Sequence, residues 1–197
     1  MLRKVSLSAA LSIALLASTA FAGETFTLDK NHSSLGFKVR HMGVSSVRGE
    51  FEDFSMEVSL DEADMTKSSV AFTADPTSVN TRNENRDDHL RTSDFLDIEN
   101  HPEISFESSS IRKDGEDFIV TGNLSIRGVT KEVDLKVAVA GPIDDPWGNH
   151  RLGIEGSVTI DRRDFGVSYN NLLEAGGLVV ANEVTIEFAV EAVRPTG

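Results

Sequence analysis

The feature that most constrains this fold is an alternation of apolar and polar side chains that recurs along most of the chain. Within 133–139, Val133, Leu135, Val137 and Val139 share one parity, and charged residues stand between several of them. Successive side chains of a β-strand point to opposite faces, so such a segment has one apolar and one wet face. This pattern is typical of antiparallel sheets with one face on a core. It recurs in the segments 35–40, 69–73, 104–107, 118–126, 152–160 and 183–191.

About eight strands of this kind, with few helical segments between them, predict an all-β sandwich or barrel. Turn-forming residues separate the strands, and the segment 113–116 (Lys-Asp-Gly-Glu) is a hairpin signal. The segments 84–97 and 170–178 look helical or irregular. Each is too short to form a second layer, so we expect them to plug or flank a barrel mouth.

One strand breaks its own alternation. Between residues 50 and 60, Phe51 has odd parity, whereas the following apolar residues, from Phe54 onward, have even parity. A regular strand cannot place both groups on one face. The sequence therefore predicts a β-bulge near Glu52-Asp53 that restores the phase and bends the strand.

The first 22 residues have the features of a secretory signal peptide. Arg3 and Lys4 precede a mostly apolar run over 5–16, which is too short to span a bilayer. Ala20-Phe21-Ala22 then supplies a cleavage site of the A-x-A kind. We predict cleavage after Ala22, export, and one domain over residues 23–197.

Composition excludes several classes of function. The chain has 32 acidic and 19 basic residues, a formal net charge of −13 at pH 7, so we expect no nucleic-acid partner. It contains no cysteine, which excludes thiol nucleophiles, thiol redox chemistry and zinc–thiolate sites.

Several segments, in order, resemble motifs of the YceI family, the bacterial periplasmic polyisoprenoid-binding proteins. Residues 28–43 (LDKNHSSLGFKVRHMG) resemble the opening D-x-x-H-S-x-x-x-F-x-x-x-H. Residues 122–131 (GNLSIRGVTK) are similar to G-x-L-T-I-x-G-V-T-x, with Ser125 in place of the more usual threonine. The late motif R-x-D-F-G resembles residues 162–166 (RRDFG). With 85–97 and 101–106, the resemblance extends from about Phe26 to Val193.

The resemblance implies an extended, antiparallel, eight-stranded lipocalin-like β-barrel with one or two short helices at its mouth. It also implies a periplasmic carrier that sequesters a long-chain polyisoprenoid or isoprenoid quinone in an apolar pore, without catalytic residues, cofactor or metal. Alternation alone does not separate a barrel filled by its own side chains from one that holds a ligand. The resemblance favours the ligand-filled barrel.

Parity and position near the matched motifs select the candidate ligand-binding residues. The predicted pore wall consists of Phe37, Val39, Phe51, Phe54, Phe72, Phe106, Leu124 and Ile126. The predicted mouth consists of His41, His89, Phe95 and Arg162. At the mouth, an arginine suits either a quinone oxygen or a phosphate.

Competing interpretations of the polar residues are weaker. His32 and His41 have opposite parities around one strand, so they do not form a predicted metal site. The charged segment 86–91 (RDDHLR) combines acids, bases and an imidazole, but it lacks a nucleophile motif and is typical of a surface turn or a capped helix start.

Two other functions remain open from the sequence. The first is an enzyme that acts on an apolar, lipid-like substrate, which would need a buried acid or histidine with a shifted pKa at the end of the pore. The second is a packed barrel that binds a protein partner through an exposed apolar patch. The sequence also leaves open a transient contact with a membrane or membrane protein, and a homodimer.

Overall fold

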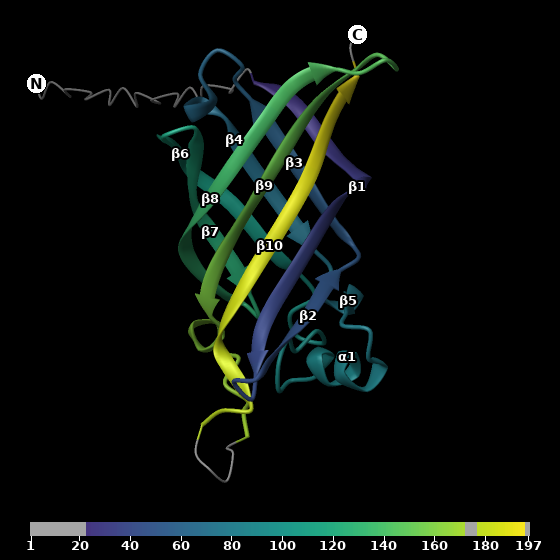
Figure 1. The fold of residues 1–197 in the computed structure, drawn as a ribbon, viewed down its shortest axis with the longest axis vertical. Coiled ribbons are helices and arrows are strands. Elements are labelled where there is room, and N and C mark those ends of the chain that lie inside the picture. The colour runs from purple at the N-terminus through teal and green to yellow at the C-terminus, as the bar shows by residue number, and fades with distance from the viewer. Residues whose placement is uncertain (1–22, 172–176, 196–197) are drawn as a thin grey trace, which may run out of the picture.

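An antiparallel sheet that closes on itself forms most of the structure (Figure 1). The computed structural model describes residues 23–171 and 177–195, so the predicted signal peptide and most of the segment 170–178 lie outside the described residues. The strands are β1 (Glu24–His41), β2 (Ser45–Phe51), β3 (Phe54–Leu60), β4 (Ser69–Ala74), β5 (Val79–Asn80), β6 (Ile104–Asp114), β7 (Asp117–Ile126), β8 (Val129–Asp144), β9 (Asn149–Asp161) and β10 (Val180–Pro195).

Neighbouring strands pair antiparallel in the order β10-β9-β8-β7-β6-β4-β3-β1, and β1 pairs with β10 to close the ring. Eight strand positions therefore make a closed barrel, which confirms the predicted fold class. β6 and β7 form the hairpin predicted over 113–116. Among the described residues, no helix is long and apolar enough to cross a membrane.

The prediction of a β-bulge near Glu52-Asp53 is wrong, because the chain leaves the sheet at these two residues. Two separate strands therefore stand where one bulged strand was expected. β2 pairs with the second half of β1, and β3 pairs with its first residues. The two-residue interruption changes the phase, so that Phe51 is half-buried and Phe54 is buried. The next barrel position is split in the same way, with β4 paired to β3 and β5 to β2.

The segment after β5 covers one end of the barrel with a helix, α1 (Glu84–Arg91), at the lower end of Figure 1. The Asn83 side chain caps the helix by accepting a hydrogen bond from Arg86 N. The buried Asp87 carboxylate accepts hydrogen bonds from the Thr81 amide (2.9 Å) and hydroxyl (2.5 Å). Arg91 donates to the carbonyl oxygens of Thr77 and Val79. The charged segment 86–91 therefore docks the helix onto the barrel.

Three short 3-10 helices complete the described structure: η1 (Met65–Lys67), η2 (Pro76–Ser78) and η3 (Arg162–Phe165). η1 connects β3 to β4 at the barrel end opposite α1, and η3 follows β9 at the α1 end. Apolar side chains point into the barrel, as in β3, where Phe54, Met56, Val58 and Leu60 are all buried. The core of this fold is thus the lining of the barrel.

Candidate functional site

Two apolar cavities lie inside the barrel, one toward each end. The η1-end cavity has a volume of about 130 Å³, and the α1-end cavity has a volume of about 170 Å³. Four residues line both cavities and form what we call the waist: Leu35, Phe72, Leu124 and Ile186. The two cavities therefore lie next to each other along the barrel with the waist between them, and we call them together the tunnel.

The tunnel has an almost completely apolar lining. The η1-end cavity is lined by apolar side chains from eight barrel strands and η1, and Ser68 is the one polar residue among its described lining. In the α1-end cavity, Arg162 is the one polar residue among the described residues that line it. An apolar cavity of roughly 150 Å³ stays dry and accepts an apolar guest, because water finds too few polar partners there. The lining therefore suits a hydrocarbon and not water.

Inward-facing glycines explain why a barrel with so many phenylalanines is not filled by their rings. Phe37 lies opposite Gly49 across β1 and β2, and Phe188 lies opposite Gly156 across β10 and β9. A Cβ atom at Gly49 would stand 2.7 Å from Phe37 Cε1, and one at Gly156 would stand 2.7 Å from Phe188 Cζ. Each ring thus lies over a glycine, against the wall.

A third glycine–phenylalanine contact lies on β6 and β7, where the two residues are diagonal neighbours because Gly122 pairs with Ser108 and Phe106 with Leu124. A Cβ atom at Gly122 would stand 2.7 Å from Phe106 Cε2. Phe106, Phe188 and Phe37 all line the tunnel, so their rings form its surface while the space along its axis stays free. A glycine at an inward-facing position is the sequence feature that predicts such a ring lying against the wall. The alternation of apolar and polar residues shows that glycine only as a position without a side chain.

The structure brings nine of the twelve predicted site residues to the tunnel. They are Phe37, Val39, Phe51, Phe72, Phe95, Phe106, Leu124, Ile126 and Arg162. Alternation had also marked the apolar faces of β9 and β10, whose residues Val158, Ile160, Val184, Ile186 and Phe188 line the tunnel but were not selected as site residues. To select these residues from the sequence, one would have to know that β10 pairs with β1 and thereby closes the barrel.

Phe54 lines neither cavity, contrary to the prediction. Its partner across β4 is the small residue Ala74, and its ring packs on Phe72 with the ring centroids 6.0 Å apart. It contributes instead to an open groove of mixed polar and apolar residues. Phe54 is therefore part of the packed wall that supports Phe72.

The two predicted mouth histidines do not reach the tunnel. His41 ends β1 beyond a shift of register against β10, where it pairs with Val180. His89 Nε2 lies 2.8 Å from a carboxylate oxygen of Asp94, and its ring contacts the rings of Phe95 and Tyr169, with centroids 5.0 Å away in both cases. Phe95 is thus the member of this aromatic cluster that faces inward, and His89 packs on it from outside.

Among the described residues that line the tunnel, Arg162 carries the one charged group, and it is only 5% exposed. Its guanidinium donates hydrogen bonds to the carbonyl oxygens of Val167 (2.8 Å), Tyr169 (2.9 Å), Ala181 (3.0 Å) and Val180 (3.4 Å). Burial lowers the pKa of this guanidinium, but an arginine stays protonated in proteins. A cation is therefore held at the wall of an apolar cavity by backbone dipoles.

Comparison with known proteins agrees with this architecture. The model of the YceI-like domain matches residues 26–192, almost all of the described chain. The chain belongs to the YceI family. A UPF0312 protein of Pectobacterium carotovorum is 39% identical over 98% of this chain and 99% of its own length.

Two solved structures are similar to this YceI chain. The YceI protein of Campylobacter jejuni has a TM-score of 0.68 and 30% identity, over 85% of this chain and 96% of the other. A polyisoprenoid-binding domain from Saccharophagus degradans, implicated in plant cell wall breakdown, shares the fold with a TM-score of 0.62. It has 19% identity, over 86% of this chain and 98% of the other.

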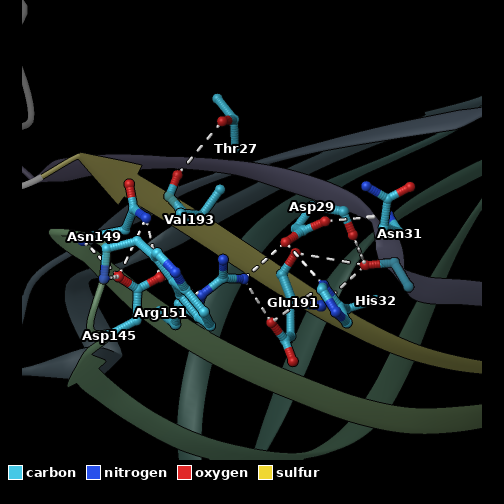
Figure 2. A network of polar contacts seen from close by, with 11 residues as sticks. Thr27, Asp29, Asn31, His32, Asp145, Asn149, Arg151, Glu191 and Val193 are labelled. Carbon is cyan, nitrogen blue, oxygen red and sulfur yellow. Dashed lines mark hydrogen bonds and ion pairs between the residues drawn. The ribbon is translucent and has the colours of Figure 1, made fainter.

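The D-x-x-H-S motif of this YceI chain belongs to a polar network on the outside of the barrel (Figure 2). Arg151 Nη1 lies 2.7 Å from the Asp29 carboxylate and 2.8 Å from the Glu191 carboxylate. His32 Nδ1 lies 3.0 Å from Asp29, and Ser33 Oγ donates to Asp29 O and accepts from Glu191 N. The motif thus fastens the irregular turn of β1, between Asp29 and Ser34, onto β10.

Arg151 neutralises acids in this network. Its Nε donates to Asp145 at 2.7 Å, and its hydrogen bond is the main cause that lowers the pKa of Asp29 to about 2. Asp29, His32 and Glu191 are close enough together to hold a metal ion. However, the Arg151 guanidinium already lies between the two carboxylates as their counter-ion (Figure 2). The arrangement is that of an ion-pair clasp across β1, β9 and β10, which we call the Arg151 clasp.

Proposed function

We propose that this protein binds one long-chain apolar lipid, a polyisoprenoid or the tail of an isoprenoid quinone, inside the tunnel. The observation that carries the proposal is the pair of apolar cavities that share the waist residues inside a closed barrel. Such a space fits a thin, flexible chain, which can pass the waist, better than it fits a compact molecule.

The energetics of burial favour this class of ligand. Each CH₂ group moved from water into an apolar site contributes about 0.8 kcal/mol. An isoprene unit of five carbons then contributes roughly 3 to 4 kcal/mol of gross driving force. A few units are enough for tight binding, even after the cost of ordering the chain.

The family and the predicted leader support the rest of the proposal. The similar domain from Saccharophagus degradans is a polyisoprenoid-binding domain, and residues 1–22 have the pattern of a secretory signal peptide. We therefore propose that this protein acts in the periplasm, where it takes up a lipid, shields it from water, and releases it at a membrane or to a membrane protein.

The lining supports binding over catalysis. Acid–base chemistry on a bound lipid would need an ionisable group near the operating pH beside the substrate. Among the residues that line the two cavities, the polar ones are Ser68 and Arg162, and the described lining contains no carboxylate or imidazole. A binding role without a cofactor is consistent with such a wall.

Native extraction tests the proposal. The protein is purified without detergent from a bacterial host that exports it, extracted with organic solvent, and the extract is analysed by mass spectrometry. We expect an isoprenoid lipid in near-equimolar amount. Extracts without lipid from several hosts, combined with no binding of added isoprenoids, would contradict the proposal.

Two variants locate the bound lipid at the waist. Phe72→Asp places a charge there and is expected to abolish lipid retention, because a carboxylate cannot be desolvated against a hydrocarbon. Ile186→Phe adds an apolar plug and is expected to reduce retention without introducing a charge. Ser69→Asp, at an exposed position of the same strand as Phe72, is the control and should retain lipid.

A further inference from the structure

The buried charge of Arg162 makes the two ends of the tunnel chemically different. The η1-end cavity offers a single neutral hydroxyl, from Ser68. The α1-end cavity has a guanidinium that is almost fully buried. An amphiphilic guest that enters this tunnel therefore encounters two chemically different ends.

The hydrogen bonds of Arg162 leave capacity for one more acceptor. A guanidinium has five N–H donors. Four hydrogen bonds to backbone carbonyl oxygens are formed, two from Nη1, one from Nε and one from Nη2. One Nη2 donor has no acceptor within the described part of the chain, on a side chain that lines the cavity.

The positive charge of Arg162 also lacks an ion-pair partner in residues 23–171 and 177–195. The adjacent Asp161 carboxylate is engaged by Arg163, whose Nε lies 2.9 and 3.1 Å from its two oxygens. Neutral carbonyl dipoles hold a cation in place without neutralising it. A buried charge of this kind is stabilised further by an anion or a strong oxygen acceptor at the same place.

We propose that the lipid binds with its oxygen-bearing head at Arg162 and its tail through the waist toward Ser68, an inference that rests on the proposed function. The head is of a class with an accepting oxygen, either the carbonyl of a quinone-like ring or an anionic phosphate. A cationic head is rejected, because it would place two positive charges together in an apolar cavity.

A series of heads on one chain tests this inference. Binding of geranylgeranyl phosphate, geranylgeranial and geranylgeranylamine is measured by displacement of a fluorescent lipid. The phosphate is expected to bind at least tenfold tighter than the amine, with the aldehyde between them. In Arg162→Met this preference should disappear, and in Arg163→Met, the exposed neighbour, it should persist.

The outcomes separate this inference from the proposed function. Equal affinities for all three heads in the wild-type protein would overturn the orientation and leave lipid binding intact. No binding of any of the three would overturn the proposed function itself. A loss of affinity in Arg162→Met that is the same for every head would show that Arg162 only holds the backbone, and would also overturn the inference.

A second measurement leaves Arg162 in place, since Arg162→Met removes four hydrogen bonds and risks misfolding. The chain has no cysteine, so a single label can be attached at Ser68→Cys, at the η1 end, or at the exposed Asp164→Cys in η3. Geranylgeranyl phosphate with a nitroxide at its tail should quench a fluorophore at residue 68 more than one at residue 164. The reverse order would overturn the proposed orientation.

Discussion

Arg151 and Arg162 lie at opposite ends of β9 and differ in every respect that matters to their roles. Arg151 is near the start of the strand, on the outer surface, among the carboxylates of Asp29, Asp145 and Glu191. Arg162 directly follows the strand, inside the barrel, among carbonyl oxygens. The single positive charge of Arg151 is surrounded by three carboxylates, whereas the charge of Arg162 has no ion-pair partner within the described residues.

This contrast in surroundings distinguishes an arginine that supports the fold from one that is placed to contact a ligand. The acids around Arg151 raise the pKa of its guanidinium, and the clasp ties three strands at the seam where the barrel closes. Arg162 lines an apolar cavity, and burial lowers its pKa. We infer that Arg151 serves the stability of the fold, whereas Arg162 serves the ligand.

Removal of the Arg151 side-chain charge should have the largest effect on stability. Arg151→Met leaves three carboxylates without their common partner and is expected to lower the melting temperature by roughly 5 °C or more. Lipid affinity of the folded protein should stay within about threefold of wild type. Thermal unfolding followed by circular dichroism, with lipid titration below the transition, measures both. A loss of lipid binding at unchanged stability would reverse the roles of the two arginines.

Narrowing the tunnel should weaken lipid binding as well as stability. Gly49→Ala adds a Cβ atom whose three nearest neighbours are side-chain atoms of Phe37 and Thr81, so the Phe37 ring must move toward the tunnel axis. Overpacking of this kind costs about 1–3 kcal/mol of fold stability. The displaced ring also takes space from a long chain in the tunnel, so long-chain affinity should fall as well, on the order of tenfold. Gly153→Ala, whose Cβ atom has ordinary contacts of 3.7 Å or more, is the matched control. Similar affinities for both variants would show that the glycine–phenylalanine pairs do not keep the tunnel open.

Acid should weaken the Arg151 clasp in a defined pH range. Hydrogen bonds from Arg151 and His32 lower the pKa of Asp29 to about 2, against about 3.9 in an unfolded chain. A lowered pKa means that this stabilisation is complete above about pH 4 and is lost as the pH falls toward 2. Urea midpoints measured between pH 5 and 2 should fall less steeply for Asp29→Asn than for wild type. Parallel curves for the two proteins would exclude Asp29 as a source of acid sensitivity.

An ordinary surface ion pair should show the smallest effect. Arg112 lies 3.3 Å from Asp134, and both side chains are more than half exposed. Exposed pairs of this kind contribute little, because water and salt screen them. Arg112→Met should leave both the melting temperature and lipid binding within experimental error. A loss comparable to that of Arg151→Met would show that the number of ion pairs, and not the clasp geometry, sets the stability.

Much of the fold follows from the sequence, because two-residue alternation directly reports which side chains face inward. Leu124 and Ile126 were placed on the wall in this way, and the hairpin over 113–116 followed from its turn residues. The interruption at Glu52-Asp53 was located but misinterpreted, since a bulge and a strand break cause the same change of parity. Only the pairing of β2 and β3 with different halves of β1 distinguishes them.

The site was less predictable, because it depends on contacts between distant segments. The alternation of apolar and polar residues does not reveal what an inward-facing ring contacts. The Phe37 ring lies over a glycine of the neighbouring strand, whereas the Phe54 ring packs on another ring of the barrel wall. The R-x-D-F-G resemblance drew attention to Arg162. Its carbonyl partners, however, come from the segment after η3 and from β10, which no local pattern could identify.

Chain-length dependence tests most directly whether the tunnel is the binding site. Affinities of the isoprenoid alcohols geraniol, farnesol, geranylgeraniol and solanesol are compared for the wild-type protein and Ile186→Phe. We predict that affinity rises with each added unit until the chain fills both cavities and then levels off, and that the plugged variant loses the gain beyond the waist. Affinities independent of length, or equal for the two proteins, would contradict the account.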